Sequence, residues 1–338
     1  MPDGFLKYSS TTVSRTEIPD HFVSPFNHFR PHRLSFFIEY AWFRKQCLHV
    51  NFDLVHSSYY NLSKACLYLI KKGIPHVITV HDLIHELLEE PDDAFLRNRL
   101  KILKNANAII TVSENTKQDL MKFYKSINEN KIHVIHHGIK DNSNCYSISD
   151  ENIIKSKFIL YVGHREGYKN FESILPVMQE LRKSYEIQLI VVGSKFTSHE
   201  KATVTKYGLD SDIINLGQIS DNYLDMLYAK CLAFAYTSLH EGFGYPLIEA
   251  MSRGAIPIAL EVSCIPEVLG TAGILVKPDG LQPMAKEIAK LIEEKDHRKK
   301  LKNHSLLRSR DFSIQKQIQK TKTVYEWTLS QGNVSRNY

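Results

Sequence analysis

The stretch LAFAYTSLHEGFGYPLIEAMSRGAIPIA, residues 232–259, decides the predicted fold. Its apolar, β-rich start ends at Ser238, a glycine-rich loop follows, and Pro246 stands where a helix would begin. Proline favours the first helical turn, because the N–H group that it lacks would have no intrahelical partner there. The order of strand, loop and helix, followed by the next apolar run, predicts a βα unit of a parallel sheet.

The same alternation of β-rich runs and amphipathic stretches extends in both directions and occurs twice along the chain. It predicts two sets of βα units, and therefore the α/β class. The predicted strands begin at Asp53, His76, Ala108 and Lys131 in the first half, and at Lys157, Gln188, Ile213, Leu232, Ile256 and Gly273 in the second. The predicted helices span residues 62–72, 94–104, 115–124, 171–183, 221–229, 247–253 and 282–294.

A polar, turn-rich segment, residues 140–152, separates the two sets and is the predicted linker. We expect two Rossmann-like domains, residues 1–145 and 153–311, that face each other across a cleft. A final helix, residues 312–330, follows the second domain, and its apolar stripe needs a surface to pack on. We expect it to cross back to the first domain. The stripe consists of Ile314, Ile318, Tyr325 and Leu329.

The composition limits the classes of protein that the chain can belong to. With 338 residues, of which 43% are hydrophobic and 24% charged, it is too long for one core and too apolar for general disorder. There is no membrane-spanning run and no secretory signal, so we expect a cytoplasmic protein. Five cysteines without a C-x-x-C pair favour reduced thiols over disulfides or a zinc site.

The net charge of +6 is concentrated in residues 286–322, which hold twelve Lys and Arg against five Asp and Glu. Two interpretations stay open for this run. It is either a solvated helix face or a surface that contacts an anionic membrane. No motif supports binding to nucleic acid.

The glycine-rich loop is a candidate anion site. The N–H groups of Gly242, Phe243 and Gly244 lie at a predicted helix start, where the helix dipole favours negative charge. Glu241 precedes this loop and Glu249 follows on the predicted first helical turn. Acids beside a phosphate are useful when they accept hydrogen bonds from hydroxyls, and a nucleotide sugar supplies both groups. In isolation, the two acids would be interpreted as a helix-dipole partner and a loop charge.

A second candidate element is KFILYVGHREGYKNF, residues 157–171, in which a strand runs into Gly163. The turn after it carries Arg165 and Lys169, and Asn170 is the predicted helix cap. Ligands of open α/β sheets bind at the carboxyl ends of the strands, where these two cations can neutralise a diphosphate. The spacing is not that of a P-loop, which argues against ATP hydrolysis.

Further candidates lie at strand ends of the first half. His81 and Asp82 close the strand of TVHDLIHE and are predicted to point into the cleft, although a strand-end histidine is often only structural. His136 and His137 end the last strand before the linker in the same way. The D-x-D sequence at Asp210 and Asp212 is interpreted as turn chemistry, so we expect no metal site.

Taken together, these residues resemble the GT-B-fold retaining glycosyltransferases of family 4, especially the mannosyltransferase-like enzymes of O-antigen and capsule assembly. The resemblance covers residues 53–331 and is strongest in the second half. The motifs that carry it are TVHDLIHE from Thr79, AIITVSENTKQDL from Ala108, KIHVIHHG from Lys131, YVGHREGYKNF from Tyr161, HEGFGYPLIEAMSRGAIPIA from His240 and SCIPEVLGTAGILVKPDG from Ser263.

The resemblance implies transfer of a hexose from a nucleotide diphosphate sugar to a lipid-linked saccharide, with retention and without a metal or other cofactor. Arg165 and Lys169 would clamp the diphosphate, and His81 would lie near the reacting carbon. Glu241 would contact the donor sugar and Glu249 the ribose. The other donor-site residues would be Gly163, Gly193, Gly242, Phe243, Gly244 and Tyr245, and the further cleft candidates are Asp82, Ser113 and His137.

One departure from the family pattern concerns the N-terminus. The glycine loop after the family's first strand has no match here, and residues 19–33 are too rich in proline for a regular helix. Only a short β-rich run from Phe5 precedes them. We therefore expect the first sheet to lack its usual first βα unit. This departure favours one alternative to a transferase, a non-catalytic module that binds nucleotide sugars, and a sugar-nucleotide epimerase of the same fold is a further alternative.

Overall fold

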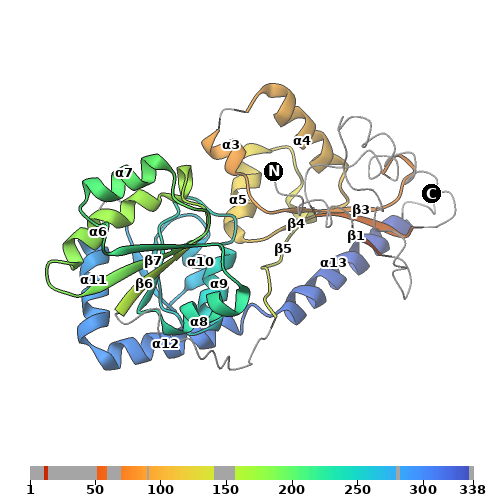
Figure 1. Ribbon diagram of the computed structural model, residues 1–338. Helices are drawn as coiled ribbons and strands as arrows, with labels where there is room; N and C mark the ends of the chain where they lie inside the picture. The colour runs from red at the N-terminus through yellow and green to blue at the C-terminus, as the bar shows by residue number, and fades with distance from the viewer. Residues whose placement is uncertain are drawn as a thin grey trace. The chain divides into compact units, whose positions relative to one another are not determined.

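The computed structural model describes residues 11–13, 52–58, 70–89, 91–140, 157–278 and 282–334 (Figure 1). The chain divides into two compact units, residues 1–136 with 318–338, and residues 137–317. Each unit contains one mainly parallel β-sheet, so the predicted α/β class with two Rossmann-like domains is confirmed. Most of the predicted linker, residues 141–152, lies outside the described residues.

The sheet of the second unit reverses its direction of growth once. Its strand order is β11-β10-β9-β6-β7-β8, and all of its paired strands are parallel. The chain adds β7 and β8 on one side of β6, and then returns to add β9, β10 and β11 on the other side. The strands are β6 (Lys157–Val162), β7 (Ile187–Val192), β8 (Ile213–Gly217), β9 (Ala233–Tyr236), β10 (Pro257–Leu260) and β11 (Ile274–Val276).

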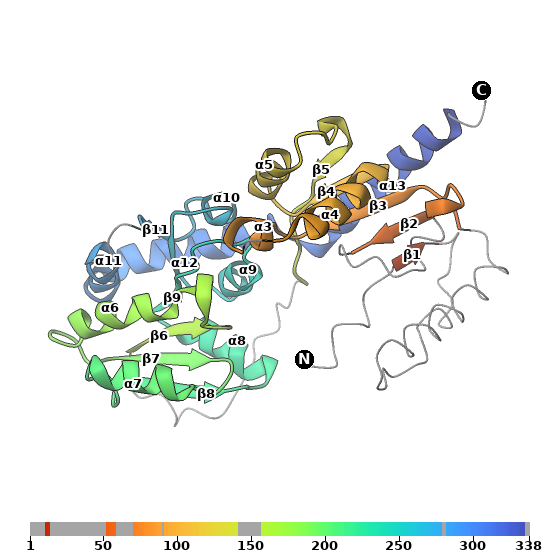
Figure 2. The same ribbon diagram turned by 90° about the horizontal axis from the view of Figure 1, so that it is seen from above.

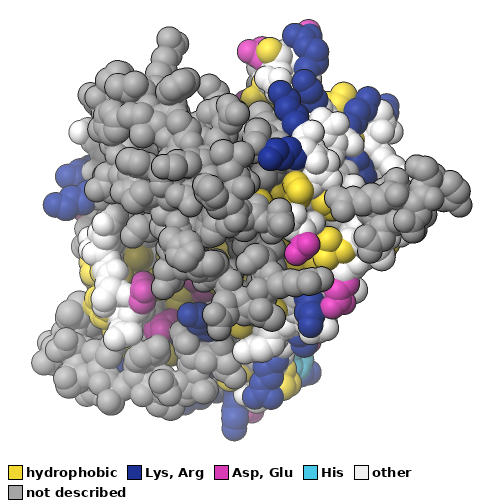
Figure 3. All heavy atoms as spheres, turned by 90° about the vertical axis from the view of Figure 1, so that its right-hand side faces the viewer, with side chains coloured by type: hydrophobic (Ala, Val, Ile, Leu, Met, Phe, Trp, Pro, Cys, Tyr) yellow, Lys and Arg dark blue, Asp and Glu magenta, His cyan; other side chains and the backbone are white. Residues whose placement is uncertain are grey.

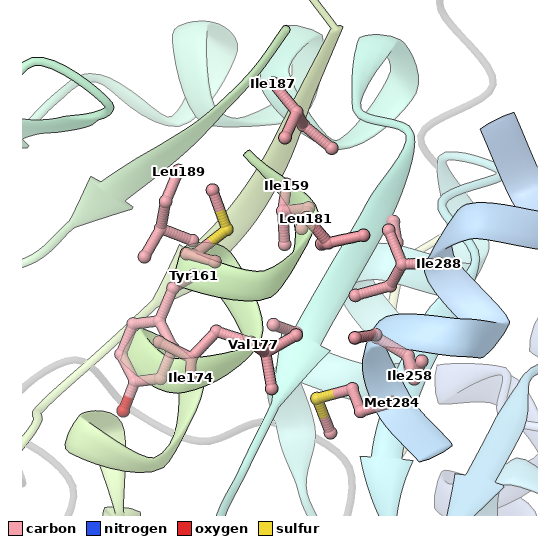
Figure 4. Packing of buried hydrophobic residues seen from close by; sticks show 14 of the residues in the cluster. Ile159, Tyr161, Ile174, Val177, Leu181, Ile187, Leu189, Ile258, Met284 and Ile288 are labelled. Carbon is pink, nitrogen blue, oxygen red and sulfur yellow. The ribbon is translucent and has the colours of Figure 1, made fainter. Parts of the chain in front are cut away.

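Helices cover both faces of this sheet because the crossovers are right-handed and the order reverses. Figure 4 shows side chains of α6 and α11 packed against strand residues such as Ile159 and Leu189 in a continuous apolar cluster. Face and edge helices are α6 (Ile174–Leu181), α7 (Ser198–Lys206), α8 (Asp221–Lys230), α9 (Tyr245–Ser252), α10 (Ile265–Leu269), α11 (Gln282–Glu293) and α12 (Lys295–Ser309), with short 3-10 turns η3 (Gly167–Lys169) and η4 (Phe171–Ser173) before α6.

The sheet of the first unit has its strands in chain order, β1-β2-β3-β4-β5. Strands β2 to β5 are parallel, whereas β1 pairs antiparallel with β2 at the edge. The strands are β1 (Thr11–Val13), β2 (Leu54–Ser57), β3 (His76–Val80), β4 (Ala108–Thr111) and β5 (Ile132–Val134). The helices between them are α3 (Ile84–Leu88), α4 (Asp93–Asn105) and α5 (Glu114–Phe123), and the 3-10 turn η2 (Glu129–Lys131) precedes β5.

The crossover helices of this unit lie on one face of the sheet, because its strands follow one another in chain order. Right-handed crossovers between successive neighbours put their helices on one face, and Ile78, Val80 and Ile109 meet α4 and α5 there. The opposite face is covered by the last helix, α13 (Ile314–Val334), which lies along the sheet in Figures 1 and 2. On that face Val77 packs with Val324. The predicted return of the final helix to the first domain is therefore confirmed.

The predicted apolar stripe of α13 packs on the first sheet at Tyr325 and Leu329 but not at Ile318. Ile318 is 61% exposed, because the helix packs on the sheet only further along, through Val324, Tyr325 and Trp327. Four of the helices that the structure describes were not predicted. Three of them, α3, α7 and α10, have nine residues or fewer, and the fourth, α12, is strongly polar.

The predicted N-terminal features are only partly within the described residues. The β-rich run from Phe5 forms β1 at its end, as a three-residue antiparallel edge strand. Residues 19–33 and most of the predicted helix 62–72 lie outside the described residues. The expected loss of a first βα unit therefore stays a prediction.

Candidate functional site

The candidate site lies where the strand order of the second sheet reverses, between β6 and β9. On either side of this point the chain leaves the sheet in opposite directions, so the loops after the two strands separate and leave room for a ligand. The loop after β6 contains Arg165 and Lys169, and the loop after β9 contains Glu241. The topology thus brings the two motifs singled out in the sequence to one edge.

Glycines end three neighbouring strands at this edge. Gly163, Gly193 and Gly217 follow or close β6, β7 and β8, and each has a positive φ, of 122°, 148° and 69°. A Cβ atom on Gly193 would lie 2.6 Å from the carbonyl oxygen of Gly163. Only glycine fits at this position, so the ends of β6 and β7 approach each other closely.

The loops after β6 and β9 are tied together by hydrogen bonds. The backbone N–H of Leu239 donates to the carbonyl of Tyr168 at 2.8 Å, and the hydroxyl of Thr237 donates to the carbonyl of Lys169 at 3.0 Å. The prediction that Asn170 caps a helix was wrong, because its side chain makes no capping hydrogen bond. Asn170 adopts a left-handed conformation between two 3-10 turns, and its amide donates to the carbonyl of Thr237 at 3.3 Å.

Lys169 and Glu241 form an ion pair across the two loops. The Lys169 Nζ lies 2.6 Å from the Glu241 Oε1, and their side chains are 22% and 10% exposed. The backbone N–H of Glu241 donates to the hydroxyl of Ser263 at 3.0 Å, and Ser263 has a positive φ of 47°. A third loop, after β10, therefore also fixes Glu241.

The glycine-rich loop leads directly into α9. Gly244 is the N-cap residue with a φ of 81°, and Pro246 lies in the first turn, as predicted. Phe243 is buried, whereas Tyr245 is 43% exposed. The ring of His137 meets the ring of Phe243 at a centroid distance of 5.2 Å and that of Tyr245 at 6.2 Å. The structure therefore brings His137 to this loop, within the second unit.

Glu249 lies in the second turn of α9, one turn later than predicted. Burial, together with the nearby carboxylate of Asp225, raises the pKa of Glu249 to about 7, although the guanidinium of Arg253 acts in the opposite direction. Arg253 is itself paired with Asp225 at 2.8 Å. Within the described part of the chain, the Glu249 carboxylate accepts no hydrogen bond and forms no ion pair. It is therefore available to hydroxyls of a ligand.

The side chain of Arg165 is engaged by Glu200 of α7 and by carbonyls of the loop after β7. Its side chain is 3% exposed and pairs with Glu200, with 2.5 Å between Nε and Oε1. It also donates to the carbonyls of Ser194 and Lys195, at 2.9 Å and 3.1 Å. This buried pair fixes the turn after β6 against α7. Glu200 also closes the capping box that begins at Thr197, a sequence signal that marks the start of α7.

The first-unit candidates have local structural roles. The Nε2 of His81 lies 2.7 Å from the carbonyl oxygen of Ser58 and therefore donates to it, while burial lowers the pKa of His81. Asp82 accepts a hydrogen bond from the backbone N–H of Ile84 at the start of α3. Ser113 caps α5 by accepting from the N–H of Thr116.

A buried polar cluster that was not predicted from the sequence lies next in the chain, in the helices that follow His81. Glu86, the last residue of TVHDLIHE, is held by Arg99 at 2.6 Å and accepts a hydrogen bond from the hydroxyl of Tyr124 at 2.7 Å. The cluster joins α3 and α4 to the residue that follows α5. It thus holds the segment that carries His81 in place.

Two family models match the chain. Glycosyl transferases group 1 matches residues 147–307, and Glycosyltransferase Family 4 matches residues 7–143. The chain belongs to family 4 of the glycosyltransferases.

Relatives of this family 4 glycosyltransferase include two bacterial mannosyltransferases. Serotype-specific mannosyltransferase WbdA of Escherichia coli is 29% identical over 262 residues, which cover 70% of this chain and 31% of WbdA. O-antigen chain mannosyltransferase RfbU of Salmonella typhimurium is 28% identical over 207 residues, covering 60% of this chain and 56% of RfbU. The chain therefore spans about a third of the length of WbdA and just over half that of RfbU.

Solved structures resemble this family 4 glycosyltransferase over most of its length. HepE of Anabaena in complex with UDP and glucose has a TM-score of 0.73 at 20% identity, and covers 86% of this chain and 82% of its own. Sucrose-phosphate synthase from Thermosynechococcus elongatus has a TM-score of 0.72 at 21% identity, with 89% and 82% covered. The predicted GT-B fold is thus confirmed.

The described part of this family 4 glycosyltransferase contains no group of three or more His, Cys, Asp or Glu side chains that could hold a metal ion. The D-x-D acids take part in local structure. Asp210 accepts a hydrogen bond from the hydroxyl of Thr205 at 2.6 Å, and Asp212 pairs with Arg182 at 3.1 Å. None of the described helices combines the length and the apolar composition that a membrane span requires.

Proposed function

We propose that the protein transfers a mannose-like hexose from a nucleotide diphosphate sugar to a lipid-linked saccharide, with retention of configuration, in the synthesis of a cell-surface polysaccharide such as O-antigen or capsule. The mannosyltransferase names of WbdA and RfbU support the sugar, and with it GDP-mannose as the donor. A Campylobacter jejuni relative named for a diphospho-undecaprenol acceptor, 25% identical over 236 residues, supports the lipid-linked acceptor.

The observation that carries the proposal is the pair formed by Lys169 and Glu241 at the reversal of the strand order. A cation and a carboxylate 2.6 Å apart suit a ligand that has both phosphates and hydroxyls. In the proposed complex Lys169 turns to the phosphates and Glu241 accepts from sugar hydroxyls. Glu249, half-buried and available, accepts from the ribose hydroxyls.

The proposed reaction needs no nucleophile from the protein. The acceptor hydroxyl attacks on the face from which the nucleotide diphosphate leaves, and the departing phosphate takes the acceptor proton. Lys169 and the backbone N–H groups at the start of α9 stabilise the charge that develops on that phosphate. Contact of Arg165 with the diphosphate and of His81 with the donor sugar stays a prediction, because Arg165 donates to Glu200 and His81 to Ser58 in this structure.

The proposed reaction is also independent of metal. The experiment that tests the function incubates the full chain with GDP-mannose and, for comparison, UDP-glucose, with and without EDTA and with a lipid-linked acceptor. Release of GDP with acceptor-dependent transfer, unchanged by EDTA, is the expected result. Binding without release would favour the non-catalytic module, and a changed sugar on intact nucleotide would favour the epimerase.

The proposed setting is the cytoplasm, with peripheral contact to the inner face of an anionic membrane where a lipid-linked acceptor is presented. Helix α12 supports this contact, since it carries six Lys or Arg and one Asp. Lys299 and Lys300 are exposed without an ion-pair partner among the described residues, and Leu307 is 57% exposed. On the face shown in Figure 3, the described Lys and Arg side chains lie in several separate groups.

Flotation with vesicles tests this contact. We expect the chain to float with phosphatidylglycerol-containing vesicles at low salt and to be released by about 0.5 M NaCl, because surface charges are then screened within a few ångströms. Flotation that salt does not change, or no flotation, would contradict an electrostatic contact.

A further inference from the structure

The hydroxyl of Tyr236 is buried at the candidate site and forms no hydrogen bond of normal geometry within the described residues. Tyr236 is the last residue of β9 and is 4% exposed. Because a buried hydroxyl in this state lowers stability, its presence in a folded protein requires an explanation.

The alternation of side chains along β9 explains where this hydroxyl points. Ala233 and Ala235 belong to the apolar cluster that includes α6 and α11, so Phe234 and Tyr236 face the other side of the sheet. There the Tyr236 hydroxyl lies 3.4 Å from the position that a Cβ atom of Gly244 would occupy. The hydroxyl is therefore directly beneath the glycine that caps α9.

The carboxylate of Glu241 is the charged group that most affects this hydroxyl. Burial raises the pKa of Tyr236 well above its usual value, and the next causes are the negative charge of Glu241 and a hydrogen-bond interaction with its carboxylate, which lies close to the hydroxyl but outside normal hydrogen-bond geometry. Glu241 is itself buried, and Lys169 contacts its Oε1. If Lys169 binds the phosphates of a ligand, the buried carboxylate of Glu241 loses its cationic partner. This loss is unfavourable unless another hydrogen-bond donor replaces Lys169.

We propose that Tyr236 is a positioning residue of the donor site, whose hydroxyl becomes the main hydrogen-bond donor to Glu241 when a bound nucleotide sugar engages Lys169. The inference rests on the proposed function. The Tyr236 hydroxyl hydrogen can rotate without movement of the ring, so a full hydrogen bond to Glu241 requires no rearrangement of the core. The bond keeps the Glu241 carboxylate turned toward the sugar hydroxyls while Lys169 serves the phosphates.

The test compares Tyr236→Phe with the wild type in the full chain. The matched control is Tyr228→Phe, since Tyr228 is 1% exposed, packs on Phe234 at 5.3 Å, and has a hydroxyl that also lacks a partner among the described residues. The measurements are the melting temperature, and kcat and KM for release of GDP from GDP-mannose. We expect Tyr236→Phe to keep or raise the melting temperature and to lower kcat about 10-fold or more, with KM changed less, since a hydrogen bond to a charged group is lost. The loss should exceed that of Tyr228→Phe by at least about 5-fold on the same grounds.

Four other outcomes would contradict the positioning role of Tyr236, and the measurements tell them apart. A wild-type chain that releases no nucleotide would refute the proposed function, and the role of Tyr236 with it. An active wild type with equal kcat in Tyr236→Phe would refute only the positioning role. Equal losses in both variants would indicate a general packing effect, and a lower melting temperature of Tyr236→Phe would show that its hydroxyl is structural.

Discussion

Lys169 is the single side chain on which the proposed chemistry depends most directly. Lys169→Ala should lower kcat for nucleotide release about 10²- to 10³-fold, the usual effect of removing one group that stabilises a developing oxyanion. Steady-state kinetics with GDP-mannose measures the effect. Lys183→Ala is the matched control, because Lys183 is 64% exposed and pairs with Glu180 on the surface. Wild-type kcat in Lys169→Ala would contradict the proposed site.

Glu249 should link stability to pH. Its pKa is about 7 in the folded chain and about 4.5 when unfolded, so between these values the folded chain binds more protons. The free energy of unfolding therefore falls as pH rises through this range. Glu249→Gln should therefore raise the free energy of unfolding by about 1–3 kcal/mol at pH 8 and by less toward pH 5. The effect is smaller than the full pKa shift would give, because the Glu249 side chain is partly exposed to solvent.

The same substitution should weaken donor binding, since an amide offers one acceptor oxygen where the carboxylate offers two. Denaturant unfolding at both pH values, together with KM for GDP-mannose, measures the two effects. The interpretation of Glu249 as a ribose-binding acid fails if Glu249→Gln is more stable at pH 8 and binds the donor as well as the wild type.

At the scale of elements, the pair of Arg165 and Glu200 joins the turn after β6 to α7. Because both side chains are nearly inaccessible to solvent, removing one leaves a buried charge, and Glu200→Ala should cost about 3–5 kcal/mol of unfolding free energy. The exposed pair of Arg182 and Asp212 is the control, and Asp212→Ala should cost about 1 kcal/mol or less. Equal costs in urea unfolding would show that Arg165 is not structurally engaged.

Elements of the sheets were predictable because buried parallel strands appear as short apolar runs between turn signals, and all ten runs predicted as parallel strands formed. Helices α3 and α10, of five residues each, are too short to show a helical period. The partner of Arg165 could not be predicted, because Glu200 lies 35 positions away and meets it only through tertiary structure. The pairing of Lys169 with Glu241 could not be predicted either, because the two residues are 72 positions apart and meet only through tertiary structure, although both site motifs were recognised.

For the whole molecule, the first unit depends on a helix from the far end of the chain. Val324→Asp should destabilise this unit by several kcal/mol, because Val324 is 5% exposed against the sheet and an ionised carboxylate there has no partner. Ile318→Asp should change stability by about 0.5 kcal/mol or less, since Ile318 is mostly exposed. Hydrogen exchange of β3 and β4 amides measures the difference. Equal protection in both variants would contradict the packing of α13.

The dependence of the first unit on α13 also determines the order in which the two units fold during synthesis on the ribosome. The second unit is one continuous segment, residues 137–317, and can fold as soon as it has emerged. The first unit begins earlier but stays incomplete until those 181 residues and α13 have been synthesised, about 10–40 s at 5–20 residues per second. Throughout that interval the face of the sheet that includes Val77, Ala108 and Ile110 lacks its cover. The half of the protein that is made first is thus finished last, and its nascent form is the stage at which a chaperone has an apolar surface to bind.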